Sequence, residues 1–472
     1  MQRYRFFRKL QNNNIYCCTA RVITGQNSSE WYCNQPNTRS LHPVHIGSMV
    51  NYAIFVGCNL EDRRAMEQIN IYSGKKAISR IVTAEDIKGL AACLEPYRSI
   101  FAVIDENVAG KCPAAAQLMD ALETRNAKVK LIASSEGGKT LASVMDICAW
   151  LLENGADRDA LVLAVGGGIT TDMAGFAACI YKRGVRFAYV PTTLLSQVDA
   201  AIGGKTGVNF DRYKNILGII RQPAFTYICP QLLESLPKRD FLSGAAELLK
   251  TFIIEDGGNY QKAADLFFDI SSEYHVEVMM YGKDDGAAWR ELLAKHRKTL
   301  NELIAAAARV KAGVVSRDQF EKGERRKLNL GHTFAHAIET LAQREALAQM
   351  EDVALKGTAA KDPEQESEAQ RFPDGVTHGE AVAMGLVLAA RLADRYYRVD
   401  RNDPTELEGK ISNDLWDSDI PCYCPYSIEE MAEIIKKDKK AEGCKVHFVL
   451  PKVIGEVETV ALTVEEVCRL MK

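Results

Sequence analysis

The sequence of 472 residues carries almost no net charge, since 59 Lys and Arg stand against 62 Asp and Glu and leave a formal charge of −3. No excess of positive charge is therefore available to attract nucleic acid or anionic lipid without regard to sequence. The sequence also lacks the roughly 18 consecutive apolar residues of a membrane span. Its basic first residues run into Asn and Gln rather than into the apolar stretch of a secretory signal. We expect a soluble, cytoplasmic protein that binds neither nucleic acid nor membranes.

The cysteines lack a pattern. There are 13 of them, an odd number, with no CxxC pair and no regular spacing. Neither a disulfide framework nor a thiolate zinc site is indicated. We expect reduced, intracellular cysteines.

The composition is that of a folded protein, with 47% hydrophobic and 26% charged residues. At about 100–200 residues per domain, the length favours two or three domains with sizeable cores. Residues 1–65 contain one short apolar stretch, at 52–56. We therefore expect an appendage there that is poorly ordered or of unknown role.

A domain with α/β organisation is predicted for residues 66–230. Apolar runs typical of strands alternate there with segments typical of helices, which favours βαβ units and a parallel sheet covered by helices, in the manner of a Rossmann-like fold. The predicted strands lie at 69–72, 79–82, 100–105, 129–134, 160–165 and 186–190.

A mostly α-helical domain is predicted for residues 231–472. Apolar residues recur at helical spacing at 241–254, 299–315, 332–341, 379–397 and 428–437. Two stretches, 256–294 and 343–376, interrupt the pattern and are read as insertions. The second is charged and poor in aromatic residues, which predicts a loop or mobile segment.

A run of three glycines, Gly166, Gly167 and Gly168, separates a predicted strand from a predicted helix. Glycines allow the backbone to approach a pyrophosphate, and a helix start offers free N–H groups and a positive dipole end. The run is not GxGxxG, because Thr171 stands where the third glycine would fall. A tight packing turn explains it equally well.

A second polar region follows the strand at 186–190, where Asp199, Lys205, Lys214 and Asn215 lie among Gly and Thr residues. Ligands of open α/β sheets bind beyond the carboxyl ends of the strands. The two lysines and the Asn suit a phosphorylated or carboxylated ligand. The alternative is a solvated surface loop.

Three residues with polar side chains in LNLGHTFAHAIE, namely Asn329, His332 and His336, have the spacing i, i+3, i+7 and are predicted to share a helix face. His378 follows in HGEAVAMGL, and Glu247 lies in an otherwise apolar helix, where a carboxylate is costly unless it is paired or metal-bound. One Glu and two His would leave a zinc position open for substrate. Histidines four residues apart are often only polar neighbours, so both readings stand.

Seven motifs in one order make the chain, from about residue 66 to its end, resemble the 3-dehydroquinate synthase family of sugar-phosphate cyclases. The motifs are VGGGITTDMAGF, RGVRFAYVPTTLLSQVDAAIGGKTGVN, the KN pair at 214–215, AAELLK, KLNLGHTFAHAIE, HGEAVAMG and KKDKK.

The resemblance implies an NAD site in the first domain and a Zn²⁺ or Co²⁺ site in the second. The NAD-binding residues implied are Asp105, Asn107, Glu136, Lys139, Gly166, Gly167, Gly168, Asp172, Thr192, Thr193, Asp199 and Lys214. The metal ligands implied are Glu247, His332 and His378.

The resemblance also implies a substrate site that uses one residue from a neighbouring subunit. The catalytic residues implied are His336, Lys250, Arg325, Asn329 and Lys205. The substrate-binding residues implied are Asp199, Lys205, Asn215, Lys250, Lys311, Arg325, Asn329, Lys439 and Lys440, together with Arg183, which would reach the substrate phosphate of a homodimer partner.

The implied reaction converts a phosphorylated sugar acid, 3-deoxy-D-arabino-heptulosonate 7-phosphate, to 3-dehydroquinate and phosphate in the shikimate pathway of aromatic amino acid biosynthesis. The reaction steps are transient oxidation by NAD, phosphate elimination, re-reduction, ring opening and an intramolecular aldol closure. The alternatives are a metal-dependent polyol or alcohol dehydrogenase of the same superfold, a related sugar-phosphate cyclase, and a non-catalytic NAD-binding or scaffold protein.

The separation of 46 residues between His332 and His378 exceeds what is usual in the family, because 343–376 lies between them.

Overall fold

The computed structural model describes the backbone at 3–9, 15–25, 28–33, 66–211, 213–356, 372, 375–398, 407–438 and 445–472. The chain divides into two compact units, Met1–Asn59 and Leu60–Lys472. Lys439 and Lys440 lie outside the described residues.

The first unit contains a three-stranded antiparallel sheet in the order β1-β2-β3. Its strands are β1 (Arg3–Lys9), β2 (Ile15–Gly25) and β3 (Ser28–Cys33). The sequence analysis did not anticipate them, although β2 contains several of the β-branched residues that favour strands.

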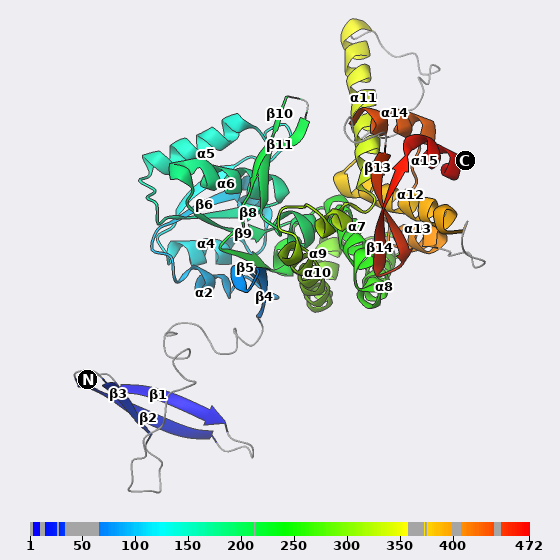
Figure 1. Ribbon diagram of the computed structural model, residues 1–472. Helices are drawn as coiled ribbons and strands as arrows, with labels where there is room; N and C mark the ends of the chain where they lie inside the picture. The colour runs from blue at the N-terminus through cyan, green and yellow to red at the C-terminus, as the bar shows by residue number, and fades with distance from the viewer. Residues whose placement is uncertain are drawn as a thin grey trace. The chain divides into compact units, whose positions relative to one another are not determined.

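The second unit begins with the predicted α/β domain, whose seven-stranded sheet has the order β4-β5-β12-β9-β8-β6-β7 (Figure 1). The strands from β5 to β7 in that order run parallel, and β4 pairs antiparallel with β5. The bounds are β4 (Glu67–Ser73), β5 (Lys76–Thr83), β6 (Ile100–Asp105), β7 (Lys128–Ile132), β8 (Leu161–Gly166), β9 (Arg186–Pro191) and β12 (Phe225–Ile228). All six predicted strands are confirmed.

Helices cover both faces of this sheet, and for that reason β6 and β8 are buried at every residue. One core joins the sheet to α2 (Leu90–Leu94), α3 (Glu106–Lys111) and α4 (Ala115–Glu123). The other joins it to α5 (Leu141–Glu153) and α6 (Gly168–Ile180). A two-stranded antiparallel hairpin of β10 (Lys205–Phe210) and β11 (Tyr213–Ile220) packs beside α6.

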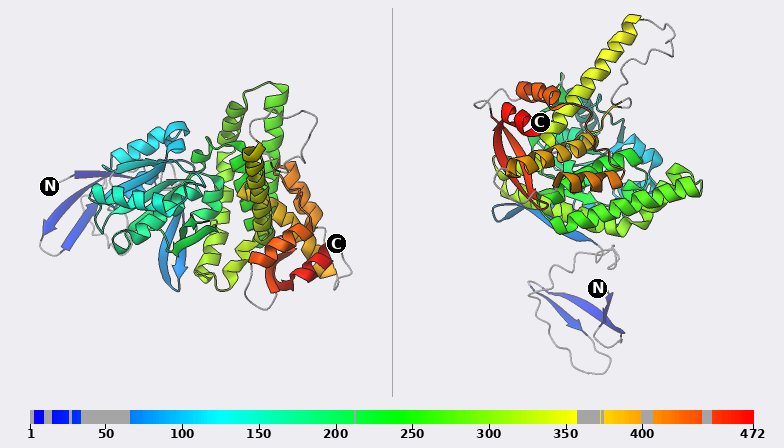
Figure 2. Two further views of the ribbon diagram at one scale, coloured as in Figure 1. Left: turned by 90° about the horizontal axis from the view of Figure 1, so that it is seen from above. Right: turned by 90° about the vertical axis from the view of Figure 1, so that its right-hand side faces the viewer.

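The helical domain has a large core, in which Phe241, Phe252, Leu303, Phe334 and Ala390 are almost fully buried and which also includes residues of β4, β5 and β12. Figure 2 shows the helices of this domain from two further directions. Its helices are α7 (Lys238–Ile254), α8 (Gly257–His275), α9 (Asp285–Lys295), α10 (Arg297–Arg317), α11 (His332–Lys356), α12 (His378–Arg398), α13 (Leu407–Asp417), α14 (Ile428–Asp438) and α15 (Val464–Met471). The five predicted helices are confirmed. A hairpin of β13 (Lys445–Val453) and β14 (Glu456–Thr463), which the sequence did not suggest, packs against α12.

The two stretches interrupt the helical pattern less than expected. Residues 256–294 do not interrupt the helical pattern, since α8 and α9 occupy most of them, and part of 343–376 continues α11 as far as Lys356. The second stretch is rich in charged residues, and these hide a helix when apolar spacing is the criterion.

Asn329 does not share a helix with the two histidines. It ends the 3₁₀ helix η5 (Glu324–Asn329), and Gly331 then takes φ +77° before α11 begins at His332. Gly331 is needed there because α12 crosses close by: a Cβ on Gly331 would lie 3.0 Å from the backbone carbon of Gly385.

Among the described residues, no helix is long and apolar enough to cross a lipid bilayer.

Candidate active site

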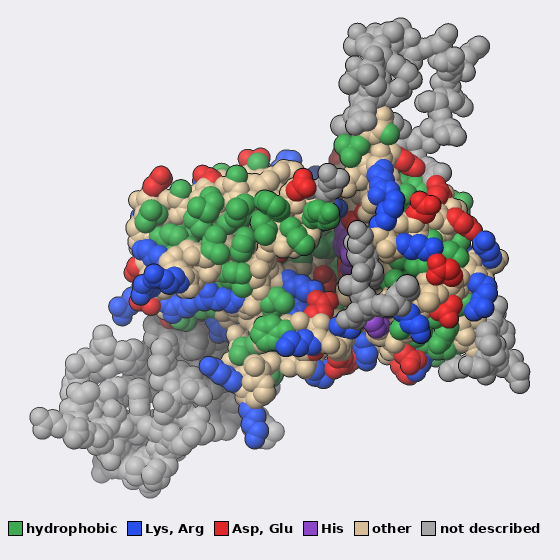
Figure 3. Space-filling view, turned by 45° about the horizontal axis from the view of Figure 1, so that its top comes forward, with side chains coloured by type: hydrophobic (Ala, Val, Ile, Leu, Met, Phe, Trp, Pro, Cys, Tyr) green, Lys and Arg blue, Asp and Glu red, His purple; other side chains and the backbone are tan. Residues whose placement is uncertain are grey.

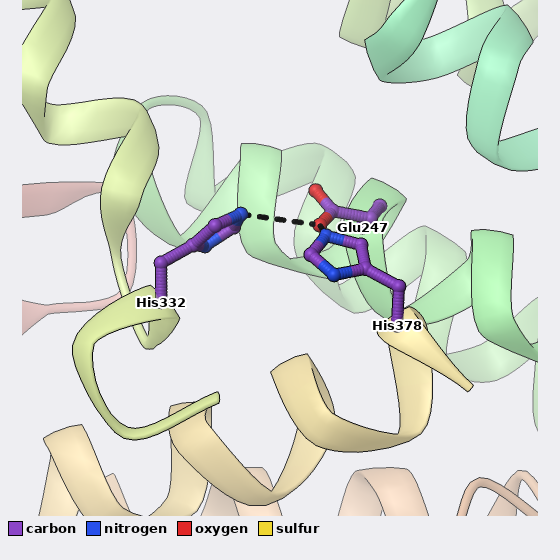
Figure 4. Close-up of side chains that lie close together, drawn as sticks. All are labelled: Glu247, His332 and His378. Atoms are coloured by element: carbon purple, nitrogen blue, oxygen red, sulfur yellow. Dashed lines mark ion pairs between the residues drawn. The ribbon is translucent and has the colours of Figure 1, made fainter. Parts of the chain in front are cut away.

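Three helices bring a carboxylate and two imidazoles together (Figure 4). Glu247 comes from the middle of α7, while His332 and His378 are the first residues of α11 and α12. Oε1 of Glu247 lies 3.7 Å from Nε2 of His332 and 3.3 Å from Nε2 of His378. One ligand atom from each residue lies within 4.8 Å of the other two. The insertion between the histidines therefore does not displace His378.

The outer nitrogen of each imidazole is also engaged. Nδ1 of His332 lies 3.2 Å from the carbonyl oxygen of Leu330, and Nδ1 of His378 lies 3.5 Å from Oε1 of Glu339 on α11. Metal-binding histidines typically present their second nitrogen to a carbonyl or carboxylate, and this fixes the tautomer and aims the free nitrogen at the ion. Both rings are held in that way.

Glu247 is the group that most needs a cation. Its side chain is 1% exposed, and neither carboxylate oxygen accepts a hydrogen bond of good geometry from the described residues. Although burial alone would raise its pKa, Lys250 and the two histidines hold the pKa of Glu247 well below its usual range. A buried, ionised carboxylate facing two imidazoles fits Zn²⁺ or Co²⁺.

The two histidines differ in charge when no metal is present. Burial and the Lys250 ammonium lower the pKa of His332 to about 3, so it offers a neutral nitrogen. Burial also opposes the charge on His378, but Glu247 and Glu339 outweigh it and raise its pKa to about 10. A metal ion must displace that proton, because an imidazole binds metal in its neutral form.

A close approach of two helix backbones sets the position of His378. The backbone N–H of Gly379 donates to Oγ of Ser243 on α7, at 2.9 Å. A Cβ on Gly379 would lie 2.0 Å from the carbonyl oxygen of Ser243, so only glycine fits. This contact joins the start of α12 to the helix that carries Glu247.

Buried charges continue from the candidate metal site towards the sheet domain. Lys250 pairs with Glu247, and its Nζ lies 4.0 Å from Oδ1 of Asp199 in the turn η2 (Ser196–Ala200). Lys311 on α10 pairs with the same carboxylate and donates to the backbone oxygen of Asp199, at 2.6 Å. Burial lowers the pKa of Lys311 to about 8, even though Asp199 opposes that shift. The sequence-predicted Lys250, Lys311 and Asp199 are thus one network.

A group of anion-binding side chains adjoins this network. Arg325 is buried and donates to the carbonyl oxygens of Gln319 and Gly203, at 2.6 and 3.1 Å. Lys205 pairs with the carboxylate of Glu321, to which Asn329 also donates, at 3.0 Å. Glu321 therefore contacts both Lys205 and Asn329.

The predicted cofactor residues lie at the carboxyl edge of the sheet. β8 lies between β6 and β9, so Asp105, the glycine turn and Thr193 follow three neighbouring strands. Asp105 caps α3 by accepting a hydrogen bond from the backbone N–H of Asn107, at 2.9 Å. A Cβ on Gly167, the residue just before α6, would lie 3.0 Å from the Thr193 side chain. The connection from β6 to β7 packs on one face of the sheet, and the connection from β7 back to β8 packs on the other. The strand order therefore reverses between β6 and β8, and α/β sheets bind dinucleotides in the crevice at such a point.

The remaining cofactor residues form a second layer around this edge. Lys139 is buried, pairs with Asp172 on α6 at 2.6 Å and donates to Asn215. Burial raises the pKa of Asp172 to about 6, although Lys139 lowers it. Glu136 accepts a hydrogen bond from Asn209, at 2.8 Å, and the backbone N–H of Thr192 donates to Gly166, at 3.0 Å.

Two further predicted residues, His336 and Arg183, are exposed. His336 is exposed one turn after His332, with ring centres 5.6 Å apart. Arg183 is exposed just beyond α6, whose 13 residues begin at the glycine turn. Since a helix rises about 1.5 Å per residue, Arg183 lies roughly 20 Å from the carboxyl edge of its own sheet.

The sequence analysis missed two acidic residues of this site, Glu321 and Glu339. Glu339 is seven residues after His332, on the same helix face, so the spacing already pointed to it. Glu321 has φ +58° and lies in the loop before η5, and no periodic pattern could have selected it.

Comparisons with known proteins agree with this geometry. Family models described as the N-terminal and C-terminal parts of 3-dehydroquinate synthase match residues 129–243 and 244–361. The chain is 33% identical over 372 residues to the 3-dehydroquinate synthase of Alkaliphilus metalliredigens, covering 79% of this chain and 89% of that protein. It is 37% identical over 331 residues to that of Rhodopirellula baltica, covering 70% and 74%.

Solved structures share the fold. A 2-epi-5-epi-valiolone synthase from Streptomyces hygroscopicus subsp. jinggangensis, with NAD⁺ and Zn²⁺ bound, matches with a TM-score of 0.62 and 26% identity, over 84% of this chain and 96% of that one. A 2-deoxy-scyllo-inosose synthase complexed with carbaglucose-6-phosphate, NAD⁺ and Co²⁺ matches with a TM-score of 0.61 and 20% identity, over 86% and 99%.

Proposed function

The chain belongs to the 3-dehydroquinate synthase family, and from that premise we propose that it converts 3-deoxy-D-arabino-heptulosonate 7-phosphate to 3-dehydroquinate and phosphate. It is an NAD- and metal-dependent lyase of the shikimate pathway. The observation that carries the proposal is the triad of Glu247, His332 and His378 beside the buried Lys250, which Asp199 connects to the cofactor edge of the sheet.

Glu247, His332 and His378 would hold the metal, which supplies a Lewis acid that lowers the pKa of a bound hydroxyl and polarises the derived ketone. The turn at Gly166–Gly168, with Asp105, Asn107 and Thr193, would hold NAD, which would supply a reversible hydride acceptor. The free N–H groups at the start of α6 suit its pyrophosphate. The other cofactor contacts proposed are Glu136, Lys139, Asp172, Thr192, Asp199 and Lys214.

The substrate is a dianionic phosphate ester with a carboxylate, and the chain offers cations in suitable places. Lys205, Arg325 and Asn329 would bind its anionic groups and hydroxyls, with Glu321 giving way to them. Lys250 and Lys311 would orient it beside the metal ligands, with Asp199, Asn215, Lys439 and Lys440 as further contacts. Holding the ring-opened product in one geometry is the main requirement of the aldol closure.

His336 is the proposed acid–base group. It is exposed on the first turns of α11, one turn from a metal ligand, so its imidazole can pass the proton released at oxidation towards solvent. The products distinguish this function from the dehydrogenase alternative, since a simple dehydrogenase would release net NADH and no phosphate.

We also propose a cytoplasmic homodimer. Exposed apolar side chains gather on the face of the sheet domain that carries α5 and the β10–β11 hairpin (Figure 3). Among them, Met145 is 54%, Leu152 is 64%, Tyr213 is 61% and Ile216 is 60% exposed. A contiguous patch of this kind is typical of a protein–protein interface. Arg183 borders α6 on this domain and is too far from its own cofactor edge, which supports its role in a partner's site.

The dimer is expected to dissociate when Ile216→Glu places a charge in this patch. Sedimentation equilibrium should give twice the chain mass for the wild type and the mass of one chain for the variant. A control, Met279→Glu, replaces a residue that is 77% exposed on the helical domain and should leave the dimer intact. A wild-type protein that sediments as a monomer would contradict the proposal. None of the eight cysteines whose side chains the structure describes forms a disulfide.

The function is tested by phosphate release from 3-deoxy-D-arabino-heptulosonate 7-phosphate with NAD and Zn²⁺. We expect release without net NADH, its loss on chelation, and a decrease of at least about 10³-fold in His332→Ala, because a ligand to the catalytic metal is missing. A thermal melt of the variant checks that it is folded. No release from folded, zinc-loaded wild type would overturn the assignment, and net NADH from polyols would then identify a dehydrogenase.

A further inference from the structure

Glu339 connects the two halves of the active site. Its Oε1 lies 3.5 Å from Nδ1 of His378 and 3.3 Å from Nζ of Lys214. His378 begins α12 in the helical domain, whereas Lys214 belongs to the β10–β11 hairpin of the sheet domain. The Glu339 side chain is only 14% exposed, so its charge is poorly compensated by water.

The lysine end of this contact continues to the cofactor edge. Asn215, next to Lys214, has φ +54° and its backbone N–H donates to Asn209, at 2.9 Å. Its side chain accepts a hydrogen bond from Lys139, which pairs with Asp172 on the helix that begins at the glycine turn. The β11 strand around Lys214 is therefore held by both the cofactor residues and Glu339.

The contact between Glu339 and His378 controls the orientation of the His378 ring. A carboxylate at Nδ1 keeps the proton on that nitrogen and directs Nε2 towards Glu247. A shift of Glu339 would rotate the ring of His378, whose backbone is already fixed by the contact between Gly379 and Ser243.

We propose that Glu339 is a positioning residue that couples metal binding to NAD binding. This proposal rests on the proposed function, in which Lys214 contacts NAD and His378 binds the metal. When Lys214 is ordered by NAD, Glu339 is held against His378 and the metal site is preorganised. Reciprocity requires that the metal favour NAD by the same factor.

The test measures two affinities rather than turnover. Titration of the metal-free protein with Co²⁺ alone, followed by its visible absorption, gives the metal affinity, and calorimetry with NAD gives the cofactor affinity, each without and with the other ligand. In the wild type each ligand should tighten the other about 5-fold or more. In Glu339→Gln the Co²⁺ affinity should fall about 10- to 100-fold, and the mutual effect should shrink to less than about 2-fold.

A second variant and a control separate coupling from stability. Lys214→Met changes a side chain that is 51% exposed, and it should abolish the mutual effect while leaving the Co²⁺ affinity without NAD nearly unchanged. Glu345→Gln lies on the same helix, where its carboxylate accepts a hydrogen bond from Tyr426, and should change neither quantity. Full mutual tightening in both Glu339→Gln and Lys214→Met would overturn the inference. A wild type that couples Co²⁺ and NAD but releases no phosphate would refute the proposed function alone.

Discussion

The Glu247→Gln variant is expected to lose metal binding and to retain less than about one thousandth of wild-type turnover. The amide keeps the shape of the side chain but removes the charge that Zn²⁺ or Co²⁺ requires beside two neutral imidazoles. It also leaves the Lys250 ammonium, which is 1% exposed, without its nearest carboxylate. Breaking a buried ion pair on one side costs about 3–5 kcal/mol. Because Asp199 lies 4.0 Å from Lys250 and remains charged, the loss of stability should be near the lower end of that range.

These two effects can be measured separately. Metal content after dialysis measures the loss of metal binding, and the urea midpoint of the metal-free protein measures the loss of stability from the broken ion pair. The double variant Glu247→Gln/Lys250→Met removes both charges and should recover most of the lost stability without recovering metal. Metal bound at wild-type stoichiometry by Glu247→Gln would show that the carboxylate is not a ligand. Equal urea midpoints for the single variant and the wild type would show that the ion pair is not buried as described.

Gly379→Ala is expected to damage the site without changing any functional group. The added methyl would lie 2.0 Å from the carbonyl oxygen of Ser243, and α7 and α12 must therefore separate. Overpacking of this kind costs about 1–3 kcal/mol. The separation moves His378 away from Glu247, and a misplacement of about 1 Å at a reacting centre can cost roughly 10²-fold in rate.

A second glycine provides the matched control. Gly409 lies on the exposed face of α13, and a Cβ there would meet nothing within 4 Å. Gly409→Ala should therefore stabilise the protein slightly, by up to about 1 kcal/mol, because alanine favours helix. Co²⁺ affinity and phosphate release should fall in Gly379→Ala and stay unchanged in Gly409→Ala. If both variants kept wild-type Co²⁺ affinity, the contact between α7 and α12 would not position His378.

Much of the site could be predicted because its residues lie in motifs that a single strand or helix presents. His332 and His336 are one turn apart on α11, and the glycine turn follows directly after β8. Local spacing placed these residues on one element in each case, and the resemblance to the family supplied their expected roles. It failed for Asn329, which Gly331 separates from α11, and for Glu321, which a left-handed loop residue brings to Lys205 and Asn329.

The sequence by itself determined the two-part organisation, the strand and helix pattern and the residue types of the metal and cofactor sites. Apolar periodicity specifies the organisation and the elements locally, and the motifs contain the residues of the sites. Only the tertiary structure decided which groups meet. Glu247 and His378 are 131 residues apart in the chain and become neighbours because Gly379 lets α12 approach α7. Likewise Glu339 meets Lys214 across 125 residues and two domains. Such contacts depend on backbone approach and burial, which no spacing within one segment can express.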